Sequence, residues 1–326
     1  MANTNILPFG QTQEMPAGYP IADNLNTNSA QQALSAKQGK KLGDELHSLK
    51  ILSVGNSFSR DSLSYVPIIM AQMGLKVEIG ILYRSSCSLQ THWEKRNDSN
   101  IYIFDRYTAA AGKWSSSATA VNYNKSLAEG LNADDWDVVL LQQASTFAYD
   151  YSTVQPYLND LIAHIAEALP RATFGWIITH AWAASSSNYA TMEITQAEYV
   201  AGTKSVAKSV MDNTACQLLL PYGIAIDLAR KDNTLSAIGD DLCFSSDKVH
   251  LLEGIACQTA AYANATAIAK FMRSRKSIVG DTTRVDSSFL NTYAIPEQHG
   301  SATGSTDANC KIAQRIAIAA NNAPFE

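Results

Sequence analysis

The chain has 326 residues, of which 46% are hydrophobic and 17% charged, so it can bury the core of one large α/β domain with extensions. Its net charge is −5 without a long basic run, which argues against nucleic acid as the main partner. The sequence contains no run of 18 apolar residues, so no membrane span is predicted. The cysteine number is odd and no Cys-x-x-Cys occurs, so we expect buried thiols, without disulfides, metal or organic cofactor.

Residues 1–48 differ in composition from the rest and predict an N-terminal arm or linker. Residues 33–46 predict a helix. Leu42, Leu46 and Leu49 are spaced at i, i+4 and i+7 in and just after this segment and form a possible packing stripe. This segment resembles one in phage tail fibres and related appendage proteins, where it joins a trimeric stem to the next domain. The resemblance implies a homotrimer; the alternative is a single amphipathic helix that leans on the main domain.

From Lys50 onward, apolar runs and helical stripes alternate. Strands are predicted at 51–54, 76–82, 138–141, 173–178 and 217–220, and helices at 62–73, 154–165, 196–211 and 251–272. This alternation predicts a three-layer α/β/α domain over 49–275, with a doubly wound, mostly parallel, five-stranded sheet. Sites in such sheets form beyond the carboxyl ends of the strands.

A long polar insertion at 85–135 separates the second and third predicted strands. Its aromatic residues suit the faces of sugars, although packing of a covering subdomain explains them equally well: Trp93, Tyr102, Tyr107, Trp114 and Tyr123. A C-terminal extension at 276–326 ends in a predicted short helix and is interpreted as a packing or display segment.

Ser57 directly follows the first predicted strand, in the segment Gly-Asn-Ser-Phe-Ser that begins at Gly55. An apolar run that ends in Gly and a hydroxyl residue indicates a buried strand, a turn and then a helix. The serine side chain would point beyond the strand, beside free helical N–H groups. Ser57 is therefore our candidate nucleophile.

Asp247 and His250 precede the last long helix and form an Asp-x-x-His segment. A carboxylate that holds one imidazole nitrogen leaves the other free to take a proton from serine. Taken alone, the segment is more often a capping Asp beside a surface His. Its combination with Ser57 predicts a Ser-His-Asp triad.

These segments resemble the first and last blocks of the SGNH (GDSL-type) hydrolases, with Asn56 where the family usually has Asp. The segment 137–145, which contains Gln-Gln-Ala-Ser, is similar to the sialate-O-acetylesterase-like branch, and Ser85-Ser86-Cys87 stands where the family usually has Gly. The resemblance covers residues 50–275. It implies an oxyanion hole formed by the Ser57 N–H, an N–H near Ser86 or Cys87, and the side-chain amide of Gln143 or its neighbour Gln142.

Further polar and aromatic residues are expected near the pocket: Asn56, Gln142, His92, Trp93, His180 and Trp182. His180 and His92 are rival bases, but a pocket-lining or packing role is favoured for both.

Two classes of function follow. The first is a serine esterase that removes O-acetyl groups from a carbohydrate. The alternative is a non-catalytic glycan- or receptor-binding module of an appendage with a hydrolase-like fold. A lipase or thioesterase is less favoured because no apolar lid is evident. Residues 1–5 show no signal-peptide leader, so we expect a cytoplasmic or appendage-associated protein that acts on a small-molecule or glycan ester, without nucleic acid or membrane.

Overall fold

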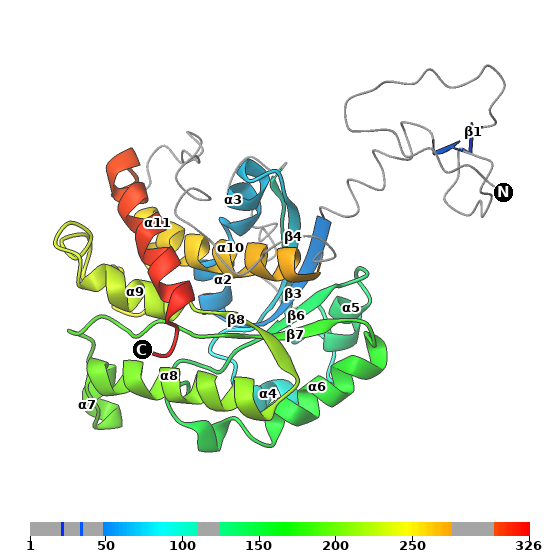
Figure 1. Cartoon of the computed structure of the whole chain (residues 1–326). Coiled ribbons are helices and arrows are strands. Elements are labelled where there is room, and N and C mark those ends of the chain that lie inside the picture. The colour runs from blue at the N-terminus through cyan, green and yellow to red at the C-terminus, as the bar shows by residue number, and fades with distance from the viewer. Residues whose placement is uncertain (1–20, 23–32, 35–47, 110–123, 276–302) are drawn as a thin grey trace. The chain divides into compact units, whose positions relative to one another are not determined.

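A computed structural model describes residues 21–22, 33–34, 48–109, 124–275 and 303–326 (Figure 1). The chain divides into two compact units, Met1–Ser48 and Leu49–Glu326. In the first unit, β1 (Ile21–Ala22) pairs in parallel with β2 (Ala33–Leu34). The helix predicted over 33–46 is therefore wrong at its first two residues, and the rest of it lies outside the described residues.

The second unit is built on a six-stranded sheet in the order β5-β4-β3-β6-β7-β8. The strands are β3 (Ser48–Gly55), β4 (Lys76–Tyr83), β5 (Ile103–Tyr107), β6 (Val138–Leu141), β7 (Thr173–Ile177) and β8 (Cys216–Leu220). The pairs β3–β6, β6–β7 and β7–β8 are parallel, whereas β5 is antiparallel to β4. The predicted mostly parallel sheet is confirmed, but it has six strands where five were expected.

Helices cover both faces of this sheet, which gives the expected three layers (Figure 1). One layer contains α2 (Ser57–Leu63), α3 (Val66–Gln72), α9 (Tyr222–Arg230), α10 (Ile255–Arg275) and α11 (Asp307–Asn322). The other contains α4 (Leu89–Glu94), α6 (Tyr157–Ala168) and α8 (Gln196–Asn213). Burial of β6 on both faces explains its uninterrupted Val-Val-Leu-Leu run.

The helix predicted over 62–73 is wrong in its bounds, because two helices stand there. The first begins at Ser57, and Pro67 lies in the first turn of the second. Proline lacks an N–H and its ring clashes inside a helix, so it favours a new helical start at this point. The last long helix likewise begins at Ile255, four residues later than expected, because Asp247 to Gly254 form an irregular loop.

The insertion at 85–135 is more regular than its polar composition suggested. It contains α4, β5 and α5 (Leu127–Leu131), while residues 110–123 lie outside the described part. Tyr102 and Tyr107 are buried in the core. These two tyrosines therefore pack the domain and cannot face a sugar, which corrects that reading of them; Trp114 and Tyr123 are not described.

At the C-terminal end, α11 packs against α10 and α9 through Cys310, Ala313 and Ala317, all of which are buried. The helix expected near the end of the chain is thus part of the layer that covers the sheet. Small residues in α10 and α11 allow a close approach of the two helices, since a face of alanines brings the backbones together. Two short helical segments complete the described chain, α7 (Asn188–Met192) and a 3₁₀ turn at Tyr151–Thr153.

Candidate active site

Ser57 is the first residue of α2 and stands at the carboxyl end of β3. The chain leaves β3 towards β4 on one side, while β6 lies on the other, so Ser57 sits where the strand order changes direction. A crevice forms at such a switch point in open α/β sheets. Asn56 caps the helix, because its side-chain oxygen accepts a hydrogen bond from Phe58 N over 3.1 Å.

The structure brings Ser57, His250 and Asp247 into one hydrogen-bonded chain. Ser57 Oγ lies 2.8 Å from His250 Nε2, although the two residues are 193 positions apart. His250 Nδ1 lies 2.7 Å from Asp247 Oδ2. A carboxylate can only accept, so Nδ1 carries the proton and Nε2 is left to accept from the serine hydroxyl.

The Asp247 carboxylate is fixed by its own loop. Its second oxygen accepts from Val249 N over 2.9 Å and from His250 N over 3.1 Å. Burial pushes the pKa of Asp247 upward, but these N–H groups and the His250 ring outweigh that effect and hold the pKa below its ordinary value. Asp247 therefore remains a carboxylate near neutral pH and can orient the imidazole.

This set is accessible from solvent. The side chains of His250 and Asp247 are 37% and 42% exposed, and Ser57 is half-buried. A substrate can thus approach the serine hydroxyl without a displacement of core residues.

A buried polar network includes residues on both sides of Ser57, namely Asn56 and Ser59. Ser53 donates to Ser59 Oγ over 3.0 Å, and Ser59 donates to the side-chain oxygen of Gln142 over 3.0 Å. Gln142 Nε2 in turn donates to Asn56 Oδ1 over 2.6 Å. Gln142 and Asn56 are therefore committed to this network and hold the turn in place; they are not free pocket-lining groups.

Gln143 turns its amide away from the role expected for it. Gln143 Nε2 donates to the carbonyl of Thr153 over 2.9 Å and lies 3.2 Å from the Thr153 hydroxyl, while its oxygen accepts from Leu89 N and Ala144 N. Both amide hydrogens are thus engaged by Thr153. This arrangement opposes the assignment of the Gln143 side chain to an oxyanion hole, because its amide already donates to Thr153. Successive residues at a strand end point in different directions, so Gln142 faces Asn56 while Gln143 faces Thr153.

The Ser85-Ser86-Cys87 turn takes the backbone shape that glycine would favour. Ser86 has φ of 51°, in the left-handed region. Cys87 N donates to the Arg84 carbonyl over 3.3 Å, so its N–H is used within the turn, which argues against the Cys87 amide as an oxyanion donor. Among the described residues nothing accepts from the Ser86 N–H or from the Ser57 N–H.

His180 and His92 are both fully buried, and neither is placed as a base. His180 Nε2 lies 2.8 Å from the Val249 carbonyl, and Nδ1 lies 3.2 Å from the Tyr222 hydroxyl. His92 Nδ1 lies 2.8 Å from the Tyr102 hydroxyl. Burial lowers the pKa of each histidine to about 3, so both stay neutral at physiological pH.

The two tryptophans expected near the pocket have packing contacts. The Arg96 guanidinium carbon lies 3.6 Å from the centroid of the Trp93 ring, and the His164 ring meets Trp93 edge-on. Trp182 is buried in a second apolar cluster with Tyr189, Tyr199 and Phe58. Phe58 directly follows Ser57, so this cluster packs next to the hydrogen-bonded set.

Asp61 is a site residue that the sequence analysis missed. It lies one helical turn after Ser57 on α2, and Asp61 Oδ2 accepts from Leu251 N over 3.1 Å. Its spacing of four from the candidate nucleophile placed both side chains on one helix face, and this signal could have found it.

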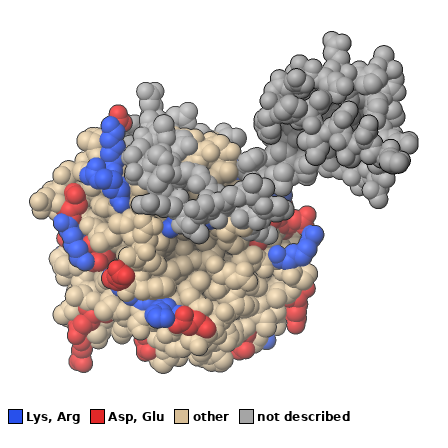
Figure 2. All heavy atoms as spheres, viewed as in Figure 1, with Lys and Arg blue, Asp and Glu red and all other residues tan. Residues whose placement is uncertain are grey.

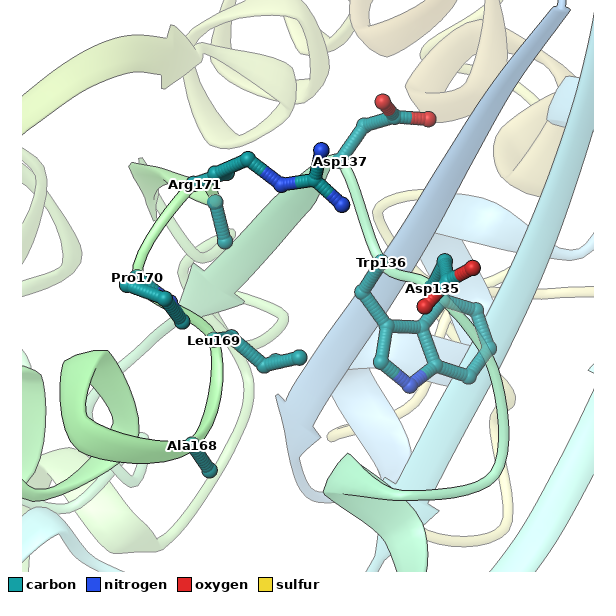
Figure 3. A pocket seen from close by; sticks show the side chains of 8 residues that line it. Asp135, Trp136, Asp137, Ala168, Leu169, Pro170 and Arg171 are labelled. Carbon is teal, nitrogen blue, oxygen red and sulfur yellow. The ribbon is translucent and has the colours of Figure 1, made fainter.

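A surface pocket lies at the amino ends of strands β6 and β7, whereas Ser57 follows the carboxyl end of β3 (Figure 3). Asp135, Trp136 and Asp137 line it before β6 begins, and residues 168–172 line it before β7. The Asp137 carboxylate accepts from Lys50 N over 2.9 Å and is thus used to hold the strands. This pocket is remote from the hydrogen-bonded set of Ser57.

Acidic and basic side chains are interspersed on the visible face of the described residues (Figure 2). Within that part of the chain, no cluster of three or more His, Cys, Asp or Glu is placed to bind a metal. All five cysteines are buried and free. None of the described helices is long and apolar enough to cross a bilayer.

Two protein-family models match the chain. A family model described as a domain of unknown function (DUF4886) matches residues 50–291, and a model of phage tail fibre repeats matches residues 21–53. A crystal structure of a DUF4886 family protein from Bacteroides uniformis ATCC 8492 has a TM-score of 0.64 at 22% identity, covering 86% of this chain and 96% of that chain. This likeness shows a shared fold.

Two other solved structures are more distantly similar. One is a candidate SGNH hydrolase from Slackia heliotrinireducens, with a TM-score of 0.43, 16% identity, and coverage of 68% of this chain and 99% of that chain. The other is an acetyl xylan esterase, AlAXEase, with a TM-score of 0.39, 12% identity, and coverage of 71% and 100%. No curated protein matches the chain.

Proposed function

The chain belongs to the DUF4886 family, and we propose that it is a serine esterase that hydrolyses an O-acetyl group on a carbohydrate through Ser57, His250 and Asp247. The observation that carries the proposal is the continuous hydrogen-bonded chain from Ser57 Oγ through His250 to Asp247, with separations of 2.8 and 2.7 Å. Both fall within the reach required of a nucleophile, its base and the group that orients the base.

The chemistry is acyl transfer to water. Ser57 Oγ attacks the ester carbonyl carbon while its proton passes to His250 Nε2, and the imidazolium is stabilised by Asp247. The tetrahedral intermediate collapses, His250 returns the proton to the leaving alkoxide, and an acetyl-serine ester remains. Water, deprotonated by His250, then releases acetate and restores Ser57.

The developing oxyanion needs donors that are already oriented. The N–H groups of Ser57 and Ser86 are the two candidates, since neither has another acceptor among the described residues. One such donor contributes about 3 kcal/mol to the stabilisation of the transition state. The left-handed φ of Ser86 supports this role, because strained backbone tends to occur at functional sites.

The preference for a carbohydrate acetyl ester rests on the similarity of the 137–145 segment to the sialate-O-acetylesterase-like branch. The half-exposed triad also suits a bulky polar substrate better than an ester with a long apolar acyl chain, which would need a buried pocket. Phe147, which is 45% exposed in the turn after β6, offers an apolar face at the same end of the sheet as Ser57.

The test is hydrolysis of 4-nitrophenyl acetate and of an acetylated oligosaccharide by the wild type and by three variants. Ser57→Ala and His250→Gln are each expected to lower kcat by about 10⁶-fold and Asp247→Asn by about 10⁴-fold, as in other triads. Asp135→Asn, at the opposite edge of the sheet, is the matched control and should keep the wild-type rate. Equal rates in the wild type and Ser57→Ala would refute the esterase and favour the non-catalytic binding module.

A location on an appendage is supported by the match of residues 21–53 to phage tail fibre repeats. In this proposal the N-terminal arm forms a homotrimer that presents three esterase domains. The solution mass of the full chain and of a chain without residues 1–48 tests it, and a monomer in both cases would refute the trimer.

A further inference from the structure

The backbone on both sides of His250 is held by side chains from other elements. Leu251 N, which follows His250, donates to Asp61 Oδ2 over 3.1 Å. The Val249 carbonyl, which precedes His250, accepts from His180 Nε2 over 2.8 Å. Among the described residues, neither the Asp61 nor the His180 side chain hydrogen-bonds the Ser57 side chain, so their side-chain hydrogen bonds act on the segment that carries His250.

Asp61 connects the base to the nucleophile through a single helix. It stands four residues after Ser57 on α2, so the helix that carries the nucleophile also carries the acceptor for Leu251. Any slide of α2 against the 247–251 loop would break this hydrogen bond and lengthen the separation of Ser57 and His250 together. Burial raises the pKa of Asp61 to about 7, and Asp247 adds to this rise, whereas His250, the Leu251 N–H and Arg60 act in the opposite direction.

His180, which follows strand β7, holds the other side of the His250 backbone. The Val249 carbonyl can only accept, so His180 Nε2 carries the proton and Nδ1 accepts from the Tyr222 hydroxyl. Its ring also stacks on Phe58 with a centroid separation of 4.1 Å, and Phe58 meets His250 edge-on at 5.9 Å. One buried ring thus contacts the residue after the nucleophile and the residue before the base.

We propose that Asp61 and His180 are positioning residues that hold His250 from two sides and keep its Nε2 within hydrogen-bonding reach of Ser57. The inference rests on the proposed function for its effect on turnover, while its structural part is independent of turnover. Small displacements of a base are costly, because a misplacement of about 1 Å can lower a rate by about 100-fold.

The test compares variants that remove each contact with variants that restore it. Asp61→Ala and His180→Leu remove the acceptor and the donor, whereas Asp61→Asn keeps an oxygen for Leu251 N and His180→Gln keeps an N–H for Val249. With 4-nitrophenyl acetate we expect kcat to fall about 10- to 100-fold in the first pair with KM nearly unchanged, and to return to within about threefold of wild type in the second pair. Asp135→Asn serves as the control for substitution as such.

A second measurement does not need hydrolysis. The ring Cε1–H correlation of His250 in NMR spectra, assigned by its loss in His250→Gln, should shift or broaden in Asp61→Ala and His180→Leu and resemble wild type in Asp61→Asn and His180→Gln. Thermal unfolding shows which variants are folded. Because Asp61 keeps some contact with solvent and His180 has none, the Asp61 pair of variants carries the test if His180→Leu fails to fold.

The outcomes separate the two proposals. Wild-type kcat and an unchanged His250 signal in folded Asp61→Ala would overturn the positioning role and leave the esterase intact. Loss without recovery in Asp61→Asn and His180→Gln would also overturn it. A wild type that hydrolyses neither ester, with the expected NMR pattern, would overturn the esterase and support the positioning of His250.

Discussion

Gln142 Nε2 donates to Asn56 Oδ1 over 2.6 Å, and this bond joins the end of β6 to the residue before the nucleophile. The same Asn56 oxygen accepts from Phe58 N at the start of α2. Asn56 Nδ2 donates to the Cys87 carbonyl over 3.3 Å. One buried amide therefore fixes three segments around Ser57.

Asn56→Ala is expected to lower the free energy of unfolding by about 2–3 kcal/mol, because it removes a helix cap and leaves the Gln142 amide unpaired. It should also reduce kcat, since the turn that presents Ser57 is loosened. Ser126→Ala, which removes the exposed cap of α5, is the control and should cost about 1 kcal/mol without loss of kcat. Urea unfolding and ester hydrolysis measure both effects, and equal losses in the two variants would contradict the role of Asn56.

Ser86→Gly is expected to raise the free energy of unfolding by about 1 kcal/mol, because glycine adopts a φ of 51° without the steric cost that serine meets. Activity should be retained, since the Ser86 N–H remains in place. Ser85→Gly provides the comparison, because Ser85 lies outside the left-handed region and should show no gain. A loss of stability in Ser86→Gly would show that the turn does not need this backbone shape.

The buried His92 should make the fold sensitive to acid. Its folded pKa of about 3 lies below its ordinary value near 6.5, so the unfolded chain binds more protons between these pH values. Stability is therefore lost as the pH falls through this window, by about 2 kcal/mol at pH 5 from this residue. His92→Asn, which keeps a polar atom for the Tyr102 hydroxyl, should flatten the slope of unfolding free energy against pH relative to wild type. If unfolding free energy falls with pH in parallel for the wild type and His92→Asn, His92 does not cause the acid sensitivity. The contribution of His180 is the same in both proteins, so it cancels in their difference.

Phe147 should matter for large substrates only. Its exposed ring lies in the turn after β6, and its neighbour Ala148 packs in the cluster that contains Phe58. Phe147→Ala is expected to raise KM for an acetylated oligosaccharide about tenfold, corresponding to the loss of an aromatic contact of about 1.4 kcal/mol, and to leave 4-nitrophenyl acetate unaffected. Phe325→Ala, which removes the other exposed phenylalanine among the described residues, is the matched control, and equal effects of the two variants would argue against a sugar contact.

The sequence predicted the elements whose residues share one environment. The Val-Val-Leu-Leu run of β6 is buried on both faces and was located without error. β5 was missed because its inward positions include Asp105, which is fully buried and paired with Arg60 over 2.6 Å. A charge in the core interrupts the alternation on which the prediction of a strand depends, and only the fold reveals its partner.

For the site, the local segments around Ser57 and around Asp247 indicated the residues that the structure brings together. The role of Gln143 could not be read in the same way, because the direction of its side chain depends on Thr153, ten residues later. Asp61 was overlooked because the helix was predicted to begin at residue 62, so its spacing of four from Ser57 was not interpreted as helical. Its partner is a backbone N–H 190 positions away, and backbone groups leave no trace in a motif.

The proposed nucleophile Ser57 lies near the start of the domain and the proposed base His250 near its end, and the helix that carries Ser57 packs against α10. During synthesis, a ribosome-bound chain therefore holds Ser57 long before the residues that activate it have emerged. Contacts between such distant segments form late, since the entropy of closing the intervening loop opposes them. Hydrolysis would thus begin only when the last helices have docked, so a truncated or half-folded chain would release no product inside the cell that makes it.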